Sequence, residues 1–152
     1  MAEKAYLAID MGASSGRHVV GRFDGQRITL EEVYRFENGA VDVAGSLYWD
    51  LLAQWTHVTG GMRAAGAAHG ERIVSVGVDT WGVDFGLLAQ GDQLLANPVH
   101  YRDARTNGMM ERAEEWVSRK EIFQHTGLQF MQLNTLYQFL AMKLANSPVL
   151  EM

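Results

Sequence analysis

A short apolar run that ends on an aspartate and passes directly into glycines and hydroxyls constrains this chain more than any other feature. It covers Ala8–Arg17, with the sequence AIDMGASSGR. Glycine lets the backbone approach a ligand oxygen closely, serine hydroxyls donate hydrogen bonds, and arginine adds positive charge. The segment therefore predicts a buried strand that opens into a phosphate-binding turn. Its donors are Ser14, Ser15 and Arg17, and Asp10 is the candidate ligand for a metal ion.

A second apolar run repeats this design further along the chain. Ile73–Val78 is continuously apolar or small and leads into the sequence DTWGVDFG at residues 79–86. A continuous run of this kind is typical of a central strand, buried on both faces of a sheet. An indole offers a flat apolar surface to the C–H face of a sugar, and a neighbouring glycine leaves the backbone open. Trp81 and Gly82 are therefore candidates for a small polar ligand such as a sugar.

Composition excludes several classes of protein. The 152 residues suit one domain with one core, and the net charge of −5 without a basic run speaks against a nucleic-acid partner. The absence of cysteine excludes disulfides and thiolate zinc sites. The first residues, MAEK, do not begin a long apolar segment, so we expect a cytoplasmic protein without a membrane anchor.

The expected fold class is α/β, a mixed sheet with flanking helices. An antiparallel meander is predicted at Tyr6–Ile9, His18–Phe23 and Arg27–Phe36, with a hairpin turn at Asp24-Gly25. A helix follows Asp50 as N-cap, with an apolar stripe at Leu51, Trp55, Val58, Met62 and Ala65. After the second apolar run, the sequence predicts a strand at Val83–Leu88, a turn at Gly91-Asp92, and helices at Met109–Trp116, Arg119–His125 and Leu136–Ala145, with Gly127 as a stop signal.

The remaining aromatic and histidine side chains carry a simpler interpretation. Trp49, Trp55 and Trp116 lie at helix starts or on apolar stripes, which predicts that they belong to the core. The five histidines show no spacing typical of a metal site.

A hydrolase is the competing interpretation of the first turn. Gly12–Gly16 also fits the G-x-S-x-G pattern of a nucleophile elbow, with Asp79 and His100 following in a hydrolase-like order. That motif requires a helix directly after the serine turn. Here a second strand and the Asp24-Gly25 turn follow instead, which argues against a hydrolase.

Four motifs in order along the chain support a family resemblance. They are Asp10–Arg17, Asp79–Phe85, Tyr101–Gly108, and Gln129-Phe130 with Asn134–Gln138. With them the chain resembles the N-terminal part of the FGGY family of carbohydrate kinases. The resemblance implies an actin/hexokinase-like fold, also described as ribonuclease H-like, of which residues 1–152 form an incomplete first domain. It also implies that the general base and the second, ATP-binding domain lie beyond residue 152, so we expect the chain alone to be inactive.

The resemblance further implies the ligands and their contacts. ATP and Mg²⁺ are the expected cofactors, with Asp10 on the metal and the phosphate contacts at Ala13, Ser14, Ser15, Gly16 and Arg17. Gly82 is the expected sugar contact, joined by Trp81, Asp84, Arg102 and Asp103. The alternative for Asp84, Arg102 and Asp103 is a structural role, in which they form an ion-pair cluster that holds the wall of the site together.

The expected reaction is phosphorylation of the primary hydroxyl of a ketose. Within the family that the chain resembles, the sequence WGVD at residues 81–84 implies L-rhamnulose as the acceptor. Another ketose or polyol is the alternative acceptor, and a fragment that binds sugar or phosphate without turnover is the alternative from a different class.

Overall fold

The computed structural model describes residues 4–151 and divides the chain into two compact units. The first unit contains the residues up to Gly39 and Asp50–Gly82, and the second contains Ala40–Trp49 and the residues from Val83 onward. Each unit has an apolar cluster of its own. The first cluster is built from strand residues and Ala65, and the second from Ala113, Ile122 and Tyr137. The expectation of a single core is therefore wrong for the part of the chain described.

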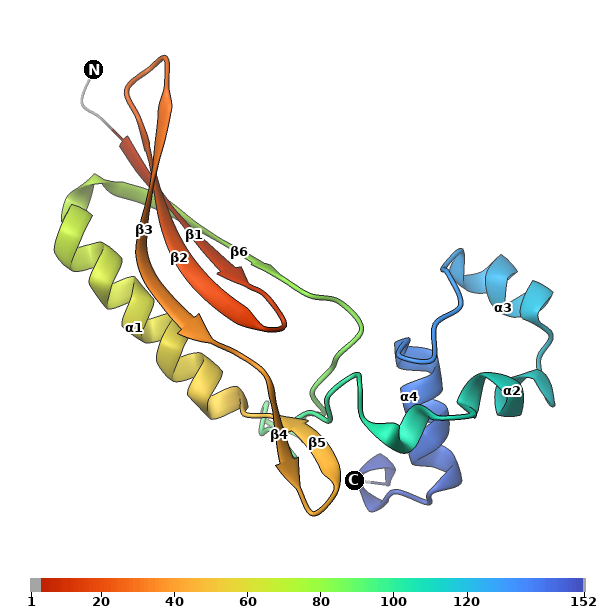
Figure 1. Cartoon of the computed structure of the whole chain (residues 1–152). Helices are drawn as coiled ribbons and strands as arrows, with labels where there is room; N and C mark the ends of the chain where they lie inside the picture. Colours follow the sequence, from red (N-terminus) through yellow and green to blue (C-terminus); the bar gives the residue numbers. More distant parts are fainter. Residues whose placement is uncertain (1–3, 152) are drawn as a thin grey trace. The chain divides into compact units, whose positions relative to one another are not determined.

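The first unit is built on a four-stranded sheet in the order β3-β2-β1-β6 (Figure 1). Its strands are β1 (Lys4–Met11), β2 (Ser15–Phe23), β3 (Ile28–Glu37) and β6 (Ile73–Thr80). The first three are antiparallel neighbours, and β6 runs parallel to β1. The Asp24 carboxylate accepts hydrogen bonds from the backbone N–H groups of Gln26 and Arg27, which closes the predicted turn between β2 and β3. The structure confirms the predicted meander and mixed sheet.

Strand β6 forms an edge of this sheet, so its prediction as a central strand is wrong. Its pairing is with β1 alone among residues 4–151. Val74, Val76 and Val78 are 54%, 52% and 65% exposed. Helix α1 contacts β1, β2 and β3, and the contacts of β6 within the first unit are concentrated on β1. A continuous apolar run specifies a strand that can be buried, but only the neighbouring elements decide whether it is.

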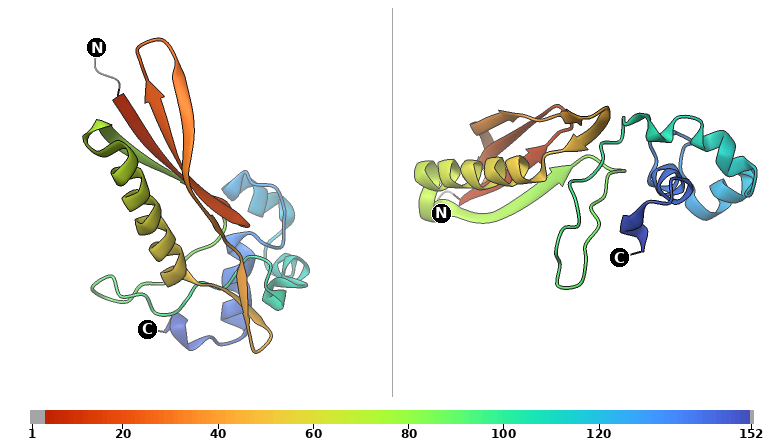
Figure 2. Two further views of the ribbon diagram at one scale, coloured as in Figure 1. Left: turned by 60° about the vertical axis from the view of Figure 1, so that its left-hand side comes forward. Right: turned by 90° about the horizontal axis from the view of Figure 1, so that it is seen from below.

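Helix α1 (Leu51–His69) lies along one face of the sheet (Figure 2). Its predicted N-cap is confirmed, because the Asp50 carboxylate accepts a hydrogen bond from the backbone N–H of Ala53 at 3.0 Å. The predicted apolar stripe is only partly right, since Trp55 is 64% exposed. The buried face contains Gln54, Gly61, Ala65 and His69. Of the predicted stripe, Ala65 belongs to the core and Val58 packs against it, whereas Trp55 and Met62 are exposed.

The second unit begins with a hairpin that the sequence did not predict. It joins β4 (Ala40–Val43) to β5 (Ser46–Trp49) through Ala44 and Gly45, which have φ values of 54° and 88°. Trp49 at its end is 1% exposed, as predicted for a core residue.

Three helices complete the second unit: α2 (Met109–Glu114), α3 (Arg119–Thr126) and α4 (Thr135–Leu144). The predicted stop at Gly127 is confirmed, because this residue adopts the left-handed conformation at φ 64° and donates its N–H to the Phe123 carbonyl. Trp116, in contrast, is 59% exposed and does not belong to the core. Of the described helices, none combines the length and hydrophobicity that a membrane crossing requires.

Residues 83–88 do not form the predicted strand. The segment turns at Gly91-Asp92 as predicted, where both residues have positive φ values of 77° and 60°. Its pairing amounts to one isolated bridge, between Leu88 and Leu94. Val83 has a φ of 72°, far from the extended conformation of a strand.

Candidate functional site

The turn between β1 and β2 is held by backbone and amide hydrogen bonds. The Gly12 N–H donates to the Ser15 carbonyl at 3.1 Å, and the Asn38 side chain donates to the Gly12 carbonyl at 2.9 Å. A Cβ at Gly12 would lie 2.7 Å from the Ser15 carbonyl oxygen, so this position requires glycine. A Cβ at Gly16 would overlap the Phe36 ring, so Gly16 is needed for packing against β3. The turn is tight and preorganised, with the Ser14 side chain exposed.

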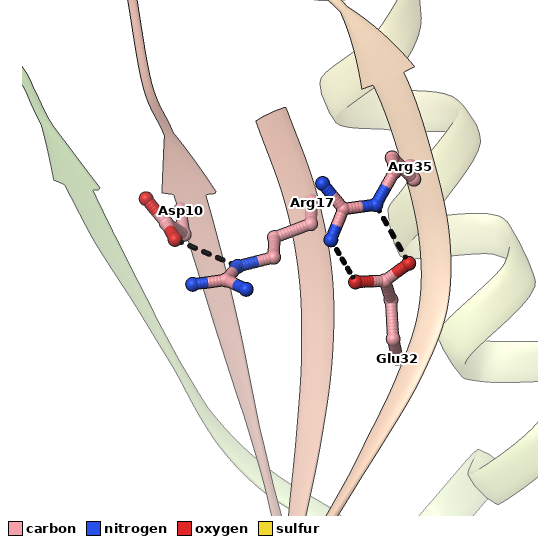
Figure 3. A network of polar contacts seen from close by, with 4 residues as sticks. All are labelled: Asp10, Arg17, Glu32 and Arg35. Carbon is pink, nitrogen blue, oxygen red and sulfur yellow. Dashed lines mark hydrogen bonds and ion pairs between the residues drawn. The ribbon is translucent and has the colours of Figure 1, made fainter. Parts of the chain in front are cut away.

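The strands carry the predicted charged residues to the end of the sheet. Asp10 on β1 is paired in register with Arg17 on β2, and Arg17 Nε donates to Asp10 Oδ2 at 2.9 Å (Figure 3). Both side chains are about half exposed, at 49% for Arg17 and 40% for Asp10. Burial alternates along β1, with Ala5, Leu7 and Ile9 in the core, so Asp10 projects from the opposite face of the sheet. The predicted metal ligand and phosphate ligand thus contact each other.

Asp10 offers a carboxylate that fits a magnesium ion accompanied by phosphate. Asp79 lies beside it, because the two residues are paired in register on the parallel strands β1 and β6. Within residues 4–151, no three His, Cys, Asp or Glu side chains are grouped as a metal site. Mg²⁺ commonly binds through one or two carboxylates, with water and substrate phosphate as the other ligands, so one or two aspartates fit this ion.

The hydrolase interpretation does not fit the backbone. After Ser14 the chain enters strand β2 and continues to Phe23 without a helical turn. A nucleophile elbow places its serine between a strand and a helix. This turn joins two antiparallel strands, so the sequence match at Gly12–Gly16 is coincidental.

Trp81 and Gly82 follow directly on β6, which ends at Thr80. A Cβ at Gly82 would meet no described atom within 4 Å. The backbone at this position is therefore open, as expected where a ligand approaches, and Gly82 and Trp81 remain predicted sugar contacts.

In the second unit, His100 lies near three predicted sugar-binding residues, Asp84, Arg102 and Asp103. We predicted no role in sugar binding for His100 itself. The charges of all three act on His100, which is 6% exposed. The backbone N–H of Arg102 donates to His100 Nδ1 at 3.0 Å, and the Arg102 guanidinium lies 5.3 Å above the centre of the Tyr101 ring. Sequence spacing gave no signal for His100 beyond its position two residues before Arg102.

Both carboxylates of this group are engaged by the protein itself. Asp84 Oδ2 accepts from Trp49 Nε1 at 2.7 Å. Asp103 is 5% exposed, and its two oxygens accept from the backbone N–H groups of Leu47 at 2.8 Å and Arg105 at 2.9 Å. Asp103 thereby ties strand β5 to the 3₁₀ turn at residues 104–106. These contacts favour a positioning role for Asp103, and its direct contact with a sugar stays a prediction.

Burial controls the ionisation of His100. Removal from solvent lowers its pKa below the usual histidine value, and the nearby Asp84 carboxylate partly opposes this effect. Because Nδ1 accepts the Arg102 N–H, the neutral ring carries its proton on Nε2. His100 is therefore a neutral support for the loop that carries Arg102 and Asp103.

Helix α4 holds the strained residue that follows Gly82. Val83 has a φ of 72°, which is unfavourable for a β-branched side chain. Its carbonyl accepts hydrogen bonds from Thr135 Oγ1 at 2.7 Å and Gln138 Nε2 at 3.2 Å. Gln138 Oε1 also accepts from Arg105 at 2.7 Å. The motif Asn134–Gln138 signalled a family resemblance, and the structure shows that two of its side chains position Val83.

Comparison with known proteins matches residues 5–145 to the model of the FGGY family of carbohydrate kinases, N-terminal domain. The chain is 39% identical over 149 residues to a rhamnulokinase from Oceanobacillus iheyensis, covering 98% of this chain and 32% of that protein. It is 40% identical over 146 residues to a rhamnulokinase from Bacteroides thetaiotaomicron, covering 96% of this chain and 30% of that protein. The chain thus spans about a third of the length of these curated relatives.

Solved structures show the same fold. The gluconate kinase from Lactobacillus acidophilus superposes with a TM-score of 0.83 at 15% identity, covering 99% of this chain and 30% of that chain. The ligand-bound xylulose kinase of the same organism superposes with a TM-score of 0.82 at 15% identity, covering 98% of this chain and 30% of that chain. The fold is therefore actin/hexokinase-like, as expected. With a family model that covers nearly all of its residues, this chain belongs to the FGGY family of carbohydrate kinases.

Proposed function

We propose that this chain is the N-terminal part of an ATP-dependent sugar kinase that converts L-rhamnulose to L-rhamnulose 1-phosphate. The observation that carries the proposal is the turn between β1 and β2, where Asp10 and Arg17 are in contact beside the Ser14 and Ser15 hydroxyls. The acceptor follows from the two rhamnulokinases at about 40% identity.

The turn would supply the groups that phosphoryl transfer requires of a protein. The reaction depends on positioned donors around the phosphate oxygens and on compensation of their charge. Backbone and hydroxyl donors from Ala13 to Gly16 would bind the oxygens, and Arg17 would orient them. Mg²⁺, when bound, neutralises phosphate charge, and Asp10 is the residue that would hold it.

Sugar recognition is assigned to the segment that follows β6 and to the cluster around His100. Trp81 would stack on the sugar ring, and Gly82 leaves space for the ligand. Asp84 and Arg102 would bind hydroxyl groups, while Asp103 positions their loop. We assign the general base for the acceptor hydroxyl to the remainder of the longer kinase, because this chain spans only about a third of the length of its rhamnulokinase relatives.

Titration of the chain with L-rhamnulose, monitored by tryptophan fluorescence, tests this assignment. The expected result is a saturable change that Trp81→Phe and Gly82→Val each abolish. Trp116→Phe is the matched control, because it removes an exposed indole on the second unit and should leave the affinity unchanged. D-xylulose, gluconate and glycerol serve as competing ligands.

The outcomes separate the alternatives. Saturation by D-xylulose in preference to L-rhamnulose would assign another acceptor to the same family. Binding that is insensitive to Gly82→Val would contradict the proposed site. Phosphorylation of L-rhamnulose by the chain on its own would contradict the assignment of the general base to the rest of the kinase.

A further inference from the structure

A second arginine lies beside the phosphate-binding turn, and neither the sequence motif nor the proposed mechanism uses it. Arg35 on β3 is paired in register with Arg17 on β2, which is itself paired with Asp10 on β1. Side chains of residues paired in this way project from the same face of a sheet. Arg35 therefore projects from the same face as Arg17 and Asp10, at the end of the sheet that carries the turn.

A β-bulge adds the fourth member of this group. The register of β2 and β3 shifts between His18 and Val19, so that Val19 pairs with Glu32 while His18 pairs with Tyr34. Residues three apart on a regular strand point to opposite faces, and the extra residue in the bulge places Glu32 on the face of Arg35. We call these four side chains the charged quartet: Asp10, Arg17, Glu32 and Arg35 (Figure 3).

The two arginines of the charged quartet are each neutralised by one carboxylate. Arg35 Nε donates to Glu32 Oε1 at 2.9 Å and Arg35 Nη2 donates to Glu32 Oε2 at 2.5 Å. Glu32 raises the pKa of Arg35, mainly through this hydrogen bond. Two like charges directly opposite each other on neighbouring strands are unfavourable without such partners. The quartet is therefore balanced without a ligand.

The Arg35–Glu32 pair is exposed, and an anion can compete with it. The two side chains are 51% and 40% exposed. Exposed ion pairs contribute little to stability because water and salt screen them. A phosphate group presents three oxygens to the planar fork of a guanidinium and binds it in the bidentate manner of a carboxylate. Exchange of Glu32 for a phosphate therefore has a small energetic cost.

Arg35 lines the same hollow as the hydroxyls of the turn. The hollow has a volume of about 600 Å³ and is lined by Ser14, Ser15, Arg35, Phe36, Glu37 and Asn38. Asn38, which also lines the hollow, donates its side-chain N–H to the Gly12 carbonyl and its backbone N–H to the Ser14 carbonyl. Glu37 is the one lining side chain of negative charge, and Arg35 is the one of positive charge. Two hydroxyls and a guanidinium around one open hollow are suited to an anion.

We propose that Arg35 is a second cationic ligand for the phosphate group bound at the turn, and that Glu32 holds Arg35 in place until the anion arrives. The ligand class is the terminal phosphate of a nucleoside triphosphate, with inorganic phosphate as its simplest form. The proposal rests on the proposed function for the identity of that ligand.

Titration of the ¹⁵N-labelled chain with inorganic phosphate and with ATP tests the proposal by NMR. The wild-type chain should show saturable shifts at the amides of Ser14–Gly16. Arg35→Gln should raise the phosphate Kd about fivefold or more. Arg35→Lys should have a Kd between those of Arg35→Gln and the wild type, because lysine keeps the charge but lacks the planar fork. Glu32→Gln should lower the Kd about two- to fivefold, since it frees the guanidinium. Arg27→Gln is the matched control, because it removes one positive charge from the same sheet at the turn between β2 and β3.

Each result decides between a ligand role and a structural one. A tighter Kd in Glu32→Gln together with a weaker one in Arg35→Gln supports the exchange, because a purely structural pair would be damaged by both variants. Equal weakening in Arg35→Gln and Arg27→Gln would show a general effect of charge and overturn the proposal. Unchanged binding in Arg35→Gln, with the turn amides still shifting, would overturn it and leave the proposed function intact. Absence of turn shifts in the wild-type chain would overturn both.

Discussion

Gly61 of helix α1 lies directly against the imidazole ring of His18 on strand β2, so closely that a Cβ at Gly61 would overlap the ring. His18 is fully buried, and its Nε2 lies 3.1 Å from the Val58 carbonyl oxygen. This contact sets the distance of the helix from the sheet. It also explains why glycine is tolerated at position 61 in the middle of a helix, where it is unfavourable relative to alanine.

Gly61→Ala should destabilise the chain. Overpacking of a tight contact costs about 1–3 kcal/mol, and the better helix propensity of alanine returns up to about 1 kcal/mol of it. Gly66→Ala is the matched control on the same helix, because a Cβ there meets no described atom within 4 Å. It should stabilise the chain by about 0.5–1 kcal/mol. Urea unfolding measures both free energies, and equal effects of the two variants would contradict the packing argument.

Acidification should lower the free energy of unfolding through His18 and His100. Burial lowers the pKa of both rings, with the Val58 carbonyl opposing the effect at His18. The unfolded chain therefore takes up protons at a higher pH than the folded chain, so stability is complete above about pH 6.5 and declines as the pH falls. Thermal unfolding between pH 8 and pH 5 measures the slope. His18→Gln should flatten it, whereas a flat profile in the wild-type chain would contradict the prediction.

Asp103→Asn should destabilise the second unit. An amide keeps one oxygen acceptor, so the backbone N–H of Leu47 or of Arg105 loses its partner in a buried position. One unsatisfied buried donor costs about 1–3 kcal/mol. Asp92→Asn removes the same charge from an exposed turn and should stay within about 0.5 kcal/mol of the wild type. Chemical denaturation compares the two, and loss of sugar binding in Asp103→Asn without loss of stability would assign the residue to direct recognition instead.

Thr135→Val should weaken the support of Val83. The substitution keeps the shape of the side chain and removes the hydroxyl that donates to the Val83 carbonyl. The expected loss is about 1 kcal/mol of stability, with weaker L-rhamnulose binding because Val83 follows Gly82. Thr56→Val on α1 removes an exposed hydroxyl that bonds within its own helix, and it is the control for the chemical change. Equal effects of the two variants would show that the Val83 carbonyl needs no support.

The sequence by itself determined the features that depend on neighbouring residues. The meander of β1, β2 and β3, the N-cap at Asp50 and the stop at Gly127 all follow from alternation, capping and glycine conformation over a few positions. It also predicted the family, because several short motifs occur in a fixed order. Asp10 and Arg17 could be predicted together for the same reason, since a tight turn places residues on both sides of it opposite each other.

Only the tertiary structure decided which surfaces of these elements are buried and which distant side chains meet. An apolar run is equally compatible with a central strand and with the exposed edge that β6 forms, since burial depends on what packs beside it. The close approach of α1 to the sheet depends on the contact between Gly61 and His18. Glu32 and Arg35 face the same way because a bulge in the pairing of β2 and β3 shifts the register by one residue. A shift of one residue reverses every side chain that follows it, and no local pattern specifies it.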